Sequence, residues 1–155
     1  MNRIVKILLT ALVVLCCSSC GKSLKDIQVT SCKLTSISPR GLSSFDASLD
    51  LGVDNPSVQV SLTKMSATLK MNGEPCLYLT ADDVTLNPKS EEVYTLTVHG
   101  LMDSKFNPFS LLTLLQDMDL EPMSVDVFCH GALKSGIGKD FVYKDLPLKD
   151  LLDKI

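Results

Sequence analysis

The run from Phe45 to Asp54 alternates between apolar residues and polar or small ones at every step. Its apolar members are Phe45, Ala47, Leu49, Leu51 and Val53. A period of two residues is typical of a β-strand with one buried face and one solvated face. Asn55-Pro56 ends the run, because proline lacks the N–H that a β-ladder needs and restricts the residue before it. The chain is therefore expected to bury one face of a sheet.

The same period recurs along most of the remaining chain. Strands are expected at 27–37, 45–53, 67–71, 76–79, 84–86, 94–98, 125–129 and 141–143. Turn signals separate them: Asn72-Gly73, in which both residues tolerate positive φ, the segment 87–90 and the segment 135–138. Seven or eight short strands with a turn about every ten residues predict an antiparallel β-sandwich.

Helical spacing replaces the two-residue period after Asn107 and Pro108, which suit a helix cap and a first helical position. The apolar residues of this segment are Phe109, Leu111, Leu112, Leu114, Leu115 and Met118. One interpretation is a helix that closes an open end of the sandwich. The alternative is a partly exposed groove for a partner or an acyl chain, which makes these six residues a candidate binding surface. A second short helix is expected after Pro147.

The N-terminus has a basic start with Arg3 and Lys6, followed by nine residues from Ile7 to Leu15 that only Thr10 interrupts. A membrane-spanning helix needs roughly 20 apolar residues, so this run is too short to span and fits the apolar part of a signal peptide. With two serines before Cys20, the segment resembles a bacterial lipoprotein signal.

That resemblance implies a removed signal peptide over 1–19, a lipidated tether over 20–26 and one domain over 27–155. Cys20 would carry the acyl lipid, and no other cofactor is expected. The following Gly21, without an acidic run, implies the periplasmic face of a Gram-negative outer membrane. An aliphatic residue is usual three residues before the lipidated cysteine, but here that residue is Cys17. Cys17 therefore stays a second candidate for lipidation. Cys17 and Cys20 also have the spacing of a redox or zinc pair, but they straddle the expected cleavage point.

The charge balance excludes some classes of partner. The chain has 15 Lys and Arg against 18 Asp and Glu; without Arg3 and Lys6 the mature chain keeps 13 basic side chains, a net charge of −5. A mildly acidic domain has no electrostatic footprint for nucleic acid. Membrane attachment would depend on the acyl chains and not on charge.

Three cysteines remain after the leader, at positions 32, 76 and 129. One disulfide with one free thiol is possible in an oxidising envelope. The alternative is three small hydrophobic side chains buried in the core.

The glycine-rich segment 131–139 invites comparison with a phosphate-binding loop. Ile137 follows Gly136 where that motif requires lysine, and Asp140 follows Lys139 where it requires serine or threonine. A hairpin turn is the better interpretation.

Carboxylates and histidines give no catalytic or metal pattern in the sequence. Asp46, Asp50 and Asp54 fall on the solvated face of a straight strand and not in a loop that wraps a calcium ion. His99 and His130 have no serine or cysteine nucleophile at a recognisable spacing, although a fold can assemble such groups. No catalytic residue, metal ligand or enzymatic activity is expected.

An ordered series of motifs resembles the type 2 late-embryogenesis-abundant (WHy-related) family. The series is the alternating strand that ends at Asn55-Pro56, the Asn72-Gly73 turn, Asn87-Pro88 before a threonine-rich strand, and a leucine-rich helix. The resemblance covers about residues 29 to 147. It implies a Greek-key β-sandwich like a fibronectin type III domain, one helix at one end, and no catalytic residues. The lipoprotein leader is a departure from the plant members.

The leading functional expectation is a lipid-anchored, non-enzymatic binding or scaffold module that holds another envelope protein. Two alternatives stay open. The family resemblance favours protection of neighbouring proteins under drying and stress. The apolar helix favours a carrier of an apolar ligand between helix and sandwich.

Overall fold

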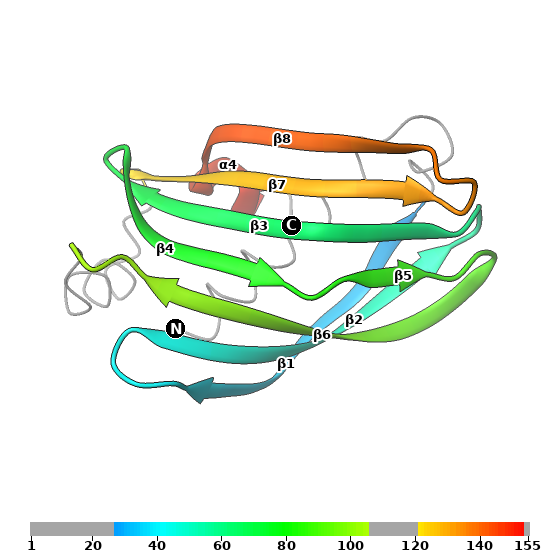
Figure 1. Cartoon of the computed structure of the whole chain (residues 1–155), viewed down its shortest axis with the longest axis horizontal. Coiled ribbons are helices and arrows are strands. Elements are labelled where there is room, and N and C mark those ends of the chain that lie inside the picture. The colour runs from blue at the N-terminus through cyan, green and yellow to red at the C-terminus, as the bar shows by residue number, and fades with distance from the viewer. Residues whose placement is uncertain (1–26, 106–120, 154–155) are drawn as a thin grey trace.

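The computed structural model describes residues 27–105 and 121–153. The strands are β1 (Gln28–Pro39), β2 (Ser44–Asn55), β3 (Val60–Met71), β4 (Glu74–Ala81), β5 (Val84–Leu86), β6 (Ser90–Met102), β7 (Met123–Leu133) and β8 (Gly138–Pro147), and α4 (Leu148–Asp153) follows them. Every strand pairing is antiparallel. The protein is therefore an all-β, sandwich-like fold with a short helix (Figure 1).

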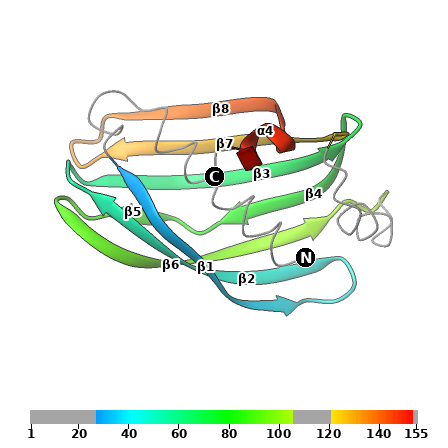
Figure 2. The ribbon, with the colours of Figure 1, turned by 180° about the vertical axis from the view of Figure 1, so that it is seen from behind.

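The strand order is β1-β2-β6-β4-β3-β7-β8, with β5 paired to β3. Strands β2, β6, β4 and β3 form a Greek key, because β2 lies beside β6 while β3 and β4 form a hairpin. Strand β4 pairs with β3 on one side and with β6 on the other, and so connects the β1-β2-β6 half to the β3-β7-β8 half. Figure 2 shows the reverse side, where α4 packs against β7 and β8.

The eight expected strands are all present, most of them longer than the sequence predicted. The short helix expected after Pro147 is also present as α4. The helix expected from Asn107 to Met118, with its six candidate binding residues, lies outside the described residues, and so does Cys20.

The core occupies one face of the sheet, as the two-residue period predicted. Each long central strand turns alternate side chains inward. The largest fully buried ones are Leu49, Leu51, Leu62, Met65, Leu69, Leu79, Leu86, Met123 and Leu148. Below, the face that carries the core is the inner face and the opposite one is the outer face.

The strands run between two ends of the molecule. The proximal end holds Ile27 and the segments 56–59, 87–89 and 134–137, because Gln28 pairs with Asp54, Asn55 with Ser90 and Val60 with Leu133. The distal end holds the segments 40–43, 72–73 and 103–105. The proximal end lies on the right in Figure 1 and the distal end on the left.

Two of the predicted turns follow the conformation that their residues favour. Asn72 and Gly73 both have positive φ, at 50° and 83°, and form the two-residue loop between β3 and β4. Gly136 has a φ of 93° in the β7–β8 turn, where its N–H donates to the carbonyl of Leu133. The glycine-rich segment is thus a hairpin turn, as expected, and not a phosphate-binding loop.

The cysteines behave as small hydrophobic side chains. Cys76 and Cys129 are buried in the core and Cys32 is half-buried against it. Cys32 and Cys76 are free thiols. Burial raises the pKa of Cys76 to about 11, and its thiol donates to the carbonyl of Leu69. These observations favour the second of the two interpretations drawn from the sequence.

Asn55 is a buried polar side chain at the end of β2. Its Nδ2 donates to the carbonyls of Val58, at 2.8 Å, and Asn87, at 3.0 Å, and its Oδ1 accepts the N–H of Ser57 at 3.0 Å. The side chain therefore ties the loop after β2 to the turn before β6, two segments that contain the Asn-Pro motifs seen in the sequence.

Substitution of Asn55 by alanine should destabilise the fold by about 2–4 kcal/mol, because it removes the Asn55 partner of the Val58 carbonyl and of the Ser57 N–H and one of the two donors to the Asn87 carbonyl. The free energy of unfolding in urea measures this loss. The control is Asp54→Ala, at the residue just before Asn55, whose side chain is on the outer side of the strand. It should change stability by no more than about 0.5 kcal/mol. Equal effects of the two substitutions would contradict the role given to Asn55.

Candidate functional site

Strand register brings a set of outer-face side chains together near the distal end of the sheet. His99 of β6 lies opposite Asp46 of β2 on one side and opposite Thr80 of β4 on the other. Two residues along the same strand, Leu101 lies opposite Tyr78. Because side chains two residues apart in a strand share a face, the His99 and Leu101 pairs stand side by side.

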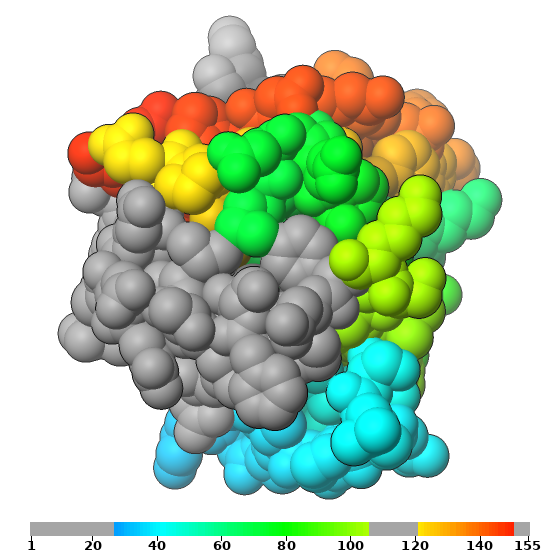
Figure 3. Space-filling model, turned by 90° about the vertical axis from the view of Figure 1, so that its left-hand side faces the viewer, coloured from blue at the N-terminus to red at the C-terminus, as the bar shows by residue number. Residues whose placement is uncertain are grey.

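The apolar part of this surface consists of Leu42, Tyr78 and Leu101. Leu101 is 52% exposed, and Leu42, in the loop between β1 and β2, is 97% exposed. This loop lies beside the end of β6, because the N–H of Met102 donates to the carbonyl of Ser43. Figure 3 shows the distal end, where the end of β6 (yellow-green) lies between the β1–β2 loop (cyan) and the β3–β4 turn (green).

Tyr78 is held in place by its hydroxyl. The Tyr78 Oη donates to Oδ2 of Asp103 at 2.7 Å, just after β6 ends. This hydrogen bond raises the pKa of Tyr78 and lowers the pKa of Asp103. The ring is therefore fixed while part of it stays open to solvent.

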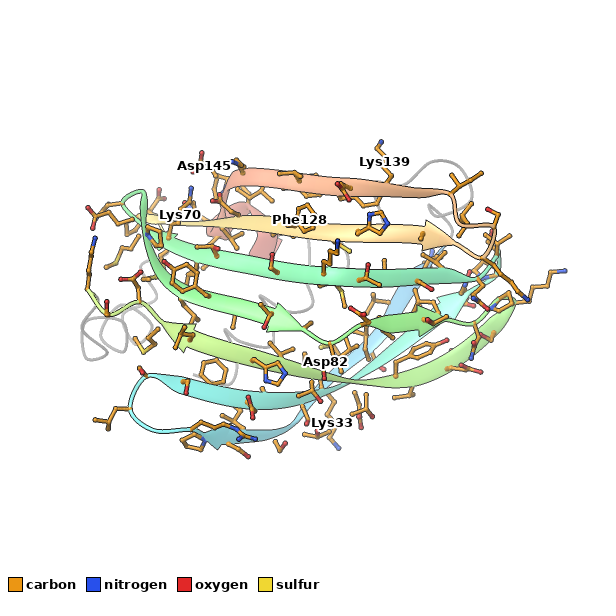
Figure 4. All side chains as sticks on the ribbon, viewed as in Figure 1. Lys33, Lys70, Asp82, Phe128, Lys139 and Asp145 are labelled. Atoms are coloured by element: carbon orange, nitrogen blue, oxygen red, sulfur yellow. The ribbon has the colours of Figure 1, made fainter. Side chains whose placement is uncertain are left out.

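The charged part centres on His99. Its Nδ1 lies 2.7 Å from Oδ1 of Asp46 and its Nε2 lies 3.3 Å from Oδ1 of Asp82, in the link between β4 and β5. Arg40 forms a further ion pair with Asp46. Figure 4 labels Asp82 on this outer face. Only the imidazolium form can donate to both carboxylates at once, so the hydrogen bonds to Asp46 and Asp82 raise the pKa of His99.

We call these seven residues the β4–β6 patch: Arg40, Leu42, Asp46, Tyr78, Asp82, His99 and Leu101. Both ring nitrogens of His99 face carboxylates, so in the imidazolium form both of its N–H groups are engaged by Asp46 and Asp82. Among the residues of this patch, tyrosine and arginine are enriched in protein–protein interfaces in general.

The other outer-face polar clusters hold the sheet together. Lys70 makes ion pairs with Asp126, at 3.0 Å, and with Asp145, and Figure 4 shows Lys70 and Asp145 near the distal end. Asp145 has a φ of 55° at a bulge in β8, and its N–H donates to Asp126. His130 bonds Asp140 through Nδ1 at 2.6 Å across β7 and β8.

Sequence reasoning did not find the β4–β6 patch. The sites that the sequence predicted are Cys20 and the six apolar side chains from Phe109 to Met118, and all of them lie outside the described residues. The alternation did place Asp46 on the solvated face of one strand and His99 among the polar residues that alternate with the apolar ones of another. The missing information was the pairing of β2 with β6, whose contacting residues Asp46 and His99 are 53 positions apart.

In residues 27–105 and 121–153, no three His, Cys, Asp or Glu side chains are arranged to hold a metal ion. Within the same ranges, no helix is long and apolar enough to cross a membrane.

No protein-family model matches the chain, and no curated protein matches it. Three solved structures are similar at low scores. A protein from Archaeoglobus fulgidus is 15% identical, with 75% of this chain and 93% of that chain covered and a TM-score of 0.47. A glycoside hydrolase family 2 β-glucuronidase is 10% identical, with 75% of this chain and 12% of the enzyme covered and a TM-score of 0.36. A structural genomics target is 14% identical over 77% of this chain and 83% of its own, with a TM-score of 0.33.

Asp46→Asn should lower the pKa of His99, because it removes the carboxylate that contributes most to raising it above its ordinary value of 6.5. NMR titration of the imidazole measures this pKa. A raised pKa means that the pairing stabilises the fold fully below about pH 6.5 and less as the pH rises through the folded-state value. Asp50→Asn is the control, since Asp50 lies on the same strand and accepts from Thr95 instead. A His99 pKa that does not respond to Asp46→Asn would contradict this assignment.

Proposed function

We propose that the protein is a lipid-anchored, non-enzymatic module that binds another envelope protein through the β4–β6 patch. The observation that carries this proposal is the patch itself: exposed Leu42, Tyr78 and Leu101 next to the ion-paired Arg40 and His99. Single exposed apolar side chains are ordinary on a protein surface. Tyr78 and Leu101 lie side by side, with Leu42 in the adjacent loop and charges at the border, and so make a surface that a partner could cover.

Preorganisation supports the same proposal. Tyr78 and Leu101 stand on central strands, with β2 on one side of β6 and β3 on the other side of β4. Tyr78 is also held by Asp103. A rigid surface loses little conformational entropy on binding, so more of the contact energy is available to hold the partner.

The place of the patch is compatible with an anchor at Cys20. The described chain begins at the proximal end, and the patch lies towards the distal end. A tether over residues 20–26 would thus leave the patch turned away from the bilayer. We place the anchored protein on the periplasmic face of the outer membrane, following the resemblance of its leader to a lipoprotein signal. We further propose that the domain is of the type 2 late-embryogenesis-abundant kind, on the ordered series of motifs in its sequence.

A photocrosslinking residue at Leu101 should capture one specific envelope protein in intact cells. Val93 is the matched control, because it lies on the same strand and the same outer face and is 66% exposed, but stands at the other end of β6. The partner should crosslink at position 101 and not at 93. Leu101→Asp should then weaken its co-purification roughly tenfold or more, as expected for a central contact residue. Absence of an adduct at 101, or the same adducts at both positions, would contradict the proposed binding surface.

Mass spectrometry of the mature protein should find an N-terminus at Cys20 that carries acyl chains. Cys20→Ser should abolish acylation and release the protein from the membrane fraction, whereas Cys17→Ser should retain both. An intact Met1, or a lipid on Cys17, would show that the anchoring cysteine is assigned wrongly.

A further inference from the structure

We propose that the proximal end of the domain docks on the lipid surface, with Ile137 and Val58 entering the interface between headgroups and acyl chains. This inference rests on the proposed anchoring at Cys20 and adds to it an orientation of the domain. The surface in question is separate from the β4–β6 patch, since the two lie at opposite ends of the strands.

Hydrogen bonds join the proximal segments into one rigid surface. Asn55 bonds both Val58 and Asn87, and the N–H of Lys89 donates to the carbonyl of Ser57. Val60 pairs with both Leu86 and Leu133, which brings the turn between β7 and β8 beside the other loops. Figure 1 shows these segments together at the right-hand end.

Two apolar side chains point out from this surface. Ile137 is 71% exposed at the base of the β7–β8 turn, just before β8, and Val58 is 44% exposed in the loop between β2 and β3. The turn is held by a hydrogen bond of 2.8 Å from the N–H of Leu133 to the carbonyl of Ile137. A fixed turn presents isoleucine to a bilayer without having to be ordered first, so its burial contributes fully to binding.

Exposed lysines lie beside these apolar residues. Lys134 is in the same turn as Ile137, and Lys89 is in the turn that hydrogen-bonds to the Val58 loop. Lysine can extend its charged amine to a headgroup phosphate while its methylene chain lies along apolar surface. This pattern of exposed apolar side chains with nearby amines fits a lipid surface.

The length of the tether selects this end of the domain. Ile27 is seven residues after Cys20, and seven residue steps span at most about 25 Å. Ile27 is buried in the core, so the tether starts from a fixed point at the proximal end. The other end of the 12-residue strand β1 lies about 40 Å further on. An anchored domain therefore keeps Ile137 and Val58 near the bilayer, where even weak insertion is favoured by the high effective concentration.

The chain contains no tryptophan, so a single introduced tryptophan reports on its own surroundings. We would place it at Ile137 in the acylated protein and reconstitute the protein on vesicles of phosphatidylcholine and phosphatidylglycerol. Ile137→Trp should shift its emission to shorter wavelength and lose intensity when the acyl chains are brominated. Leu42→Trp is the control, because Leu42 is an exposed loop position at the distal end. Its emission should neither shift nor be quenched.

The outcomes separate this inference from the anchoring proposal. If the acylated protein floats with the vesicles but position 137 is not quenched, the orientation is wrong and the anchor stands. Equal quenching at 137 and 42 would also overturn the orientation. If protein with an intact Cys20 is not acylated and does not float, both proposals fail. Circular dichroism of each variant confirms the fold, which an exposed turn substitution should leave intact.

Discussion

The buried side chain of Asn55 fixes how the two halves of this sheet meet. The chain passes from the β1-β2-β6 half to the β3-β7-β8 half between β2 and β3, and returns between β5 and β6. Asn55 bonds both connections, through Val58 in the first and Asn87 in the second. An amide offers a donor group and an acceptor in one compact side chain, so it satisfies both segments where no apolar residue could. Each half is thereby held in one position relative to the other.

The outer-face chemistry depends on that same position. Strands β2 and β6 pair without a bulge from Asn55 opposite Ser90 to Ser44 opposite Leu101. Asp46 therefore faces His99 only because the register is set correctly at the proximal end. A slip of one residue would turn the whole strand over and place leucine and valine side chains in water. Burial of the apolar face thus fixes the strand register, and this register brings Asp46, His99 and Leu101 close together.

Local chemistry made much of the fold predictable. The alternation in β2 and the Asn72-Gly73 turn express preferences of neighbouring residues, so the sequence shows them directly. The bulge at Asp145 and the ion pairs of Lys70 depend on partners in distant strands, which no local pattern contains. The β4–β6 patch was missed for the same reason, because its histidine and aspartates come from separate strands. The lipidation site at Cys20 and the leucine-rich helix lie outside the described residues, so those predictions stay predictions.

Strand direction has a mechanical consequence. A protein tethered at the start of β1 and gripped at the end of β6 would be pulled along the strands and not across them. The 12 residues of β1 pair with β2 over nearly their whole length, so the ladder would resist such a pull in shear, with many hydrogen bonds loaded together. A force applied across the strands would open the same bonds one after another. For the anchored, partner-bound protein that we propose, the arrangement of β1, β2 and β6 would therefore suit a load-bearing link.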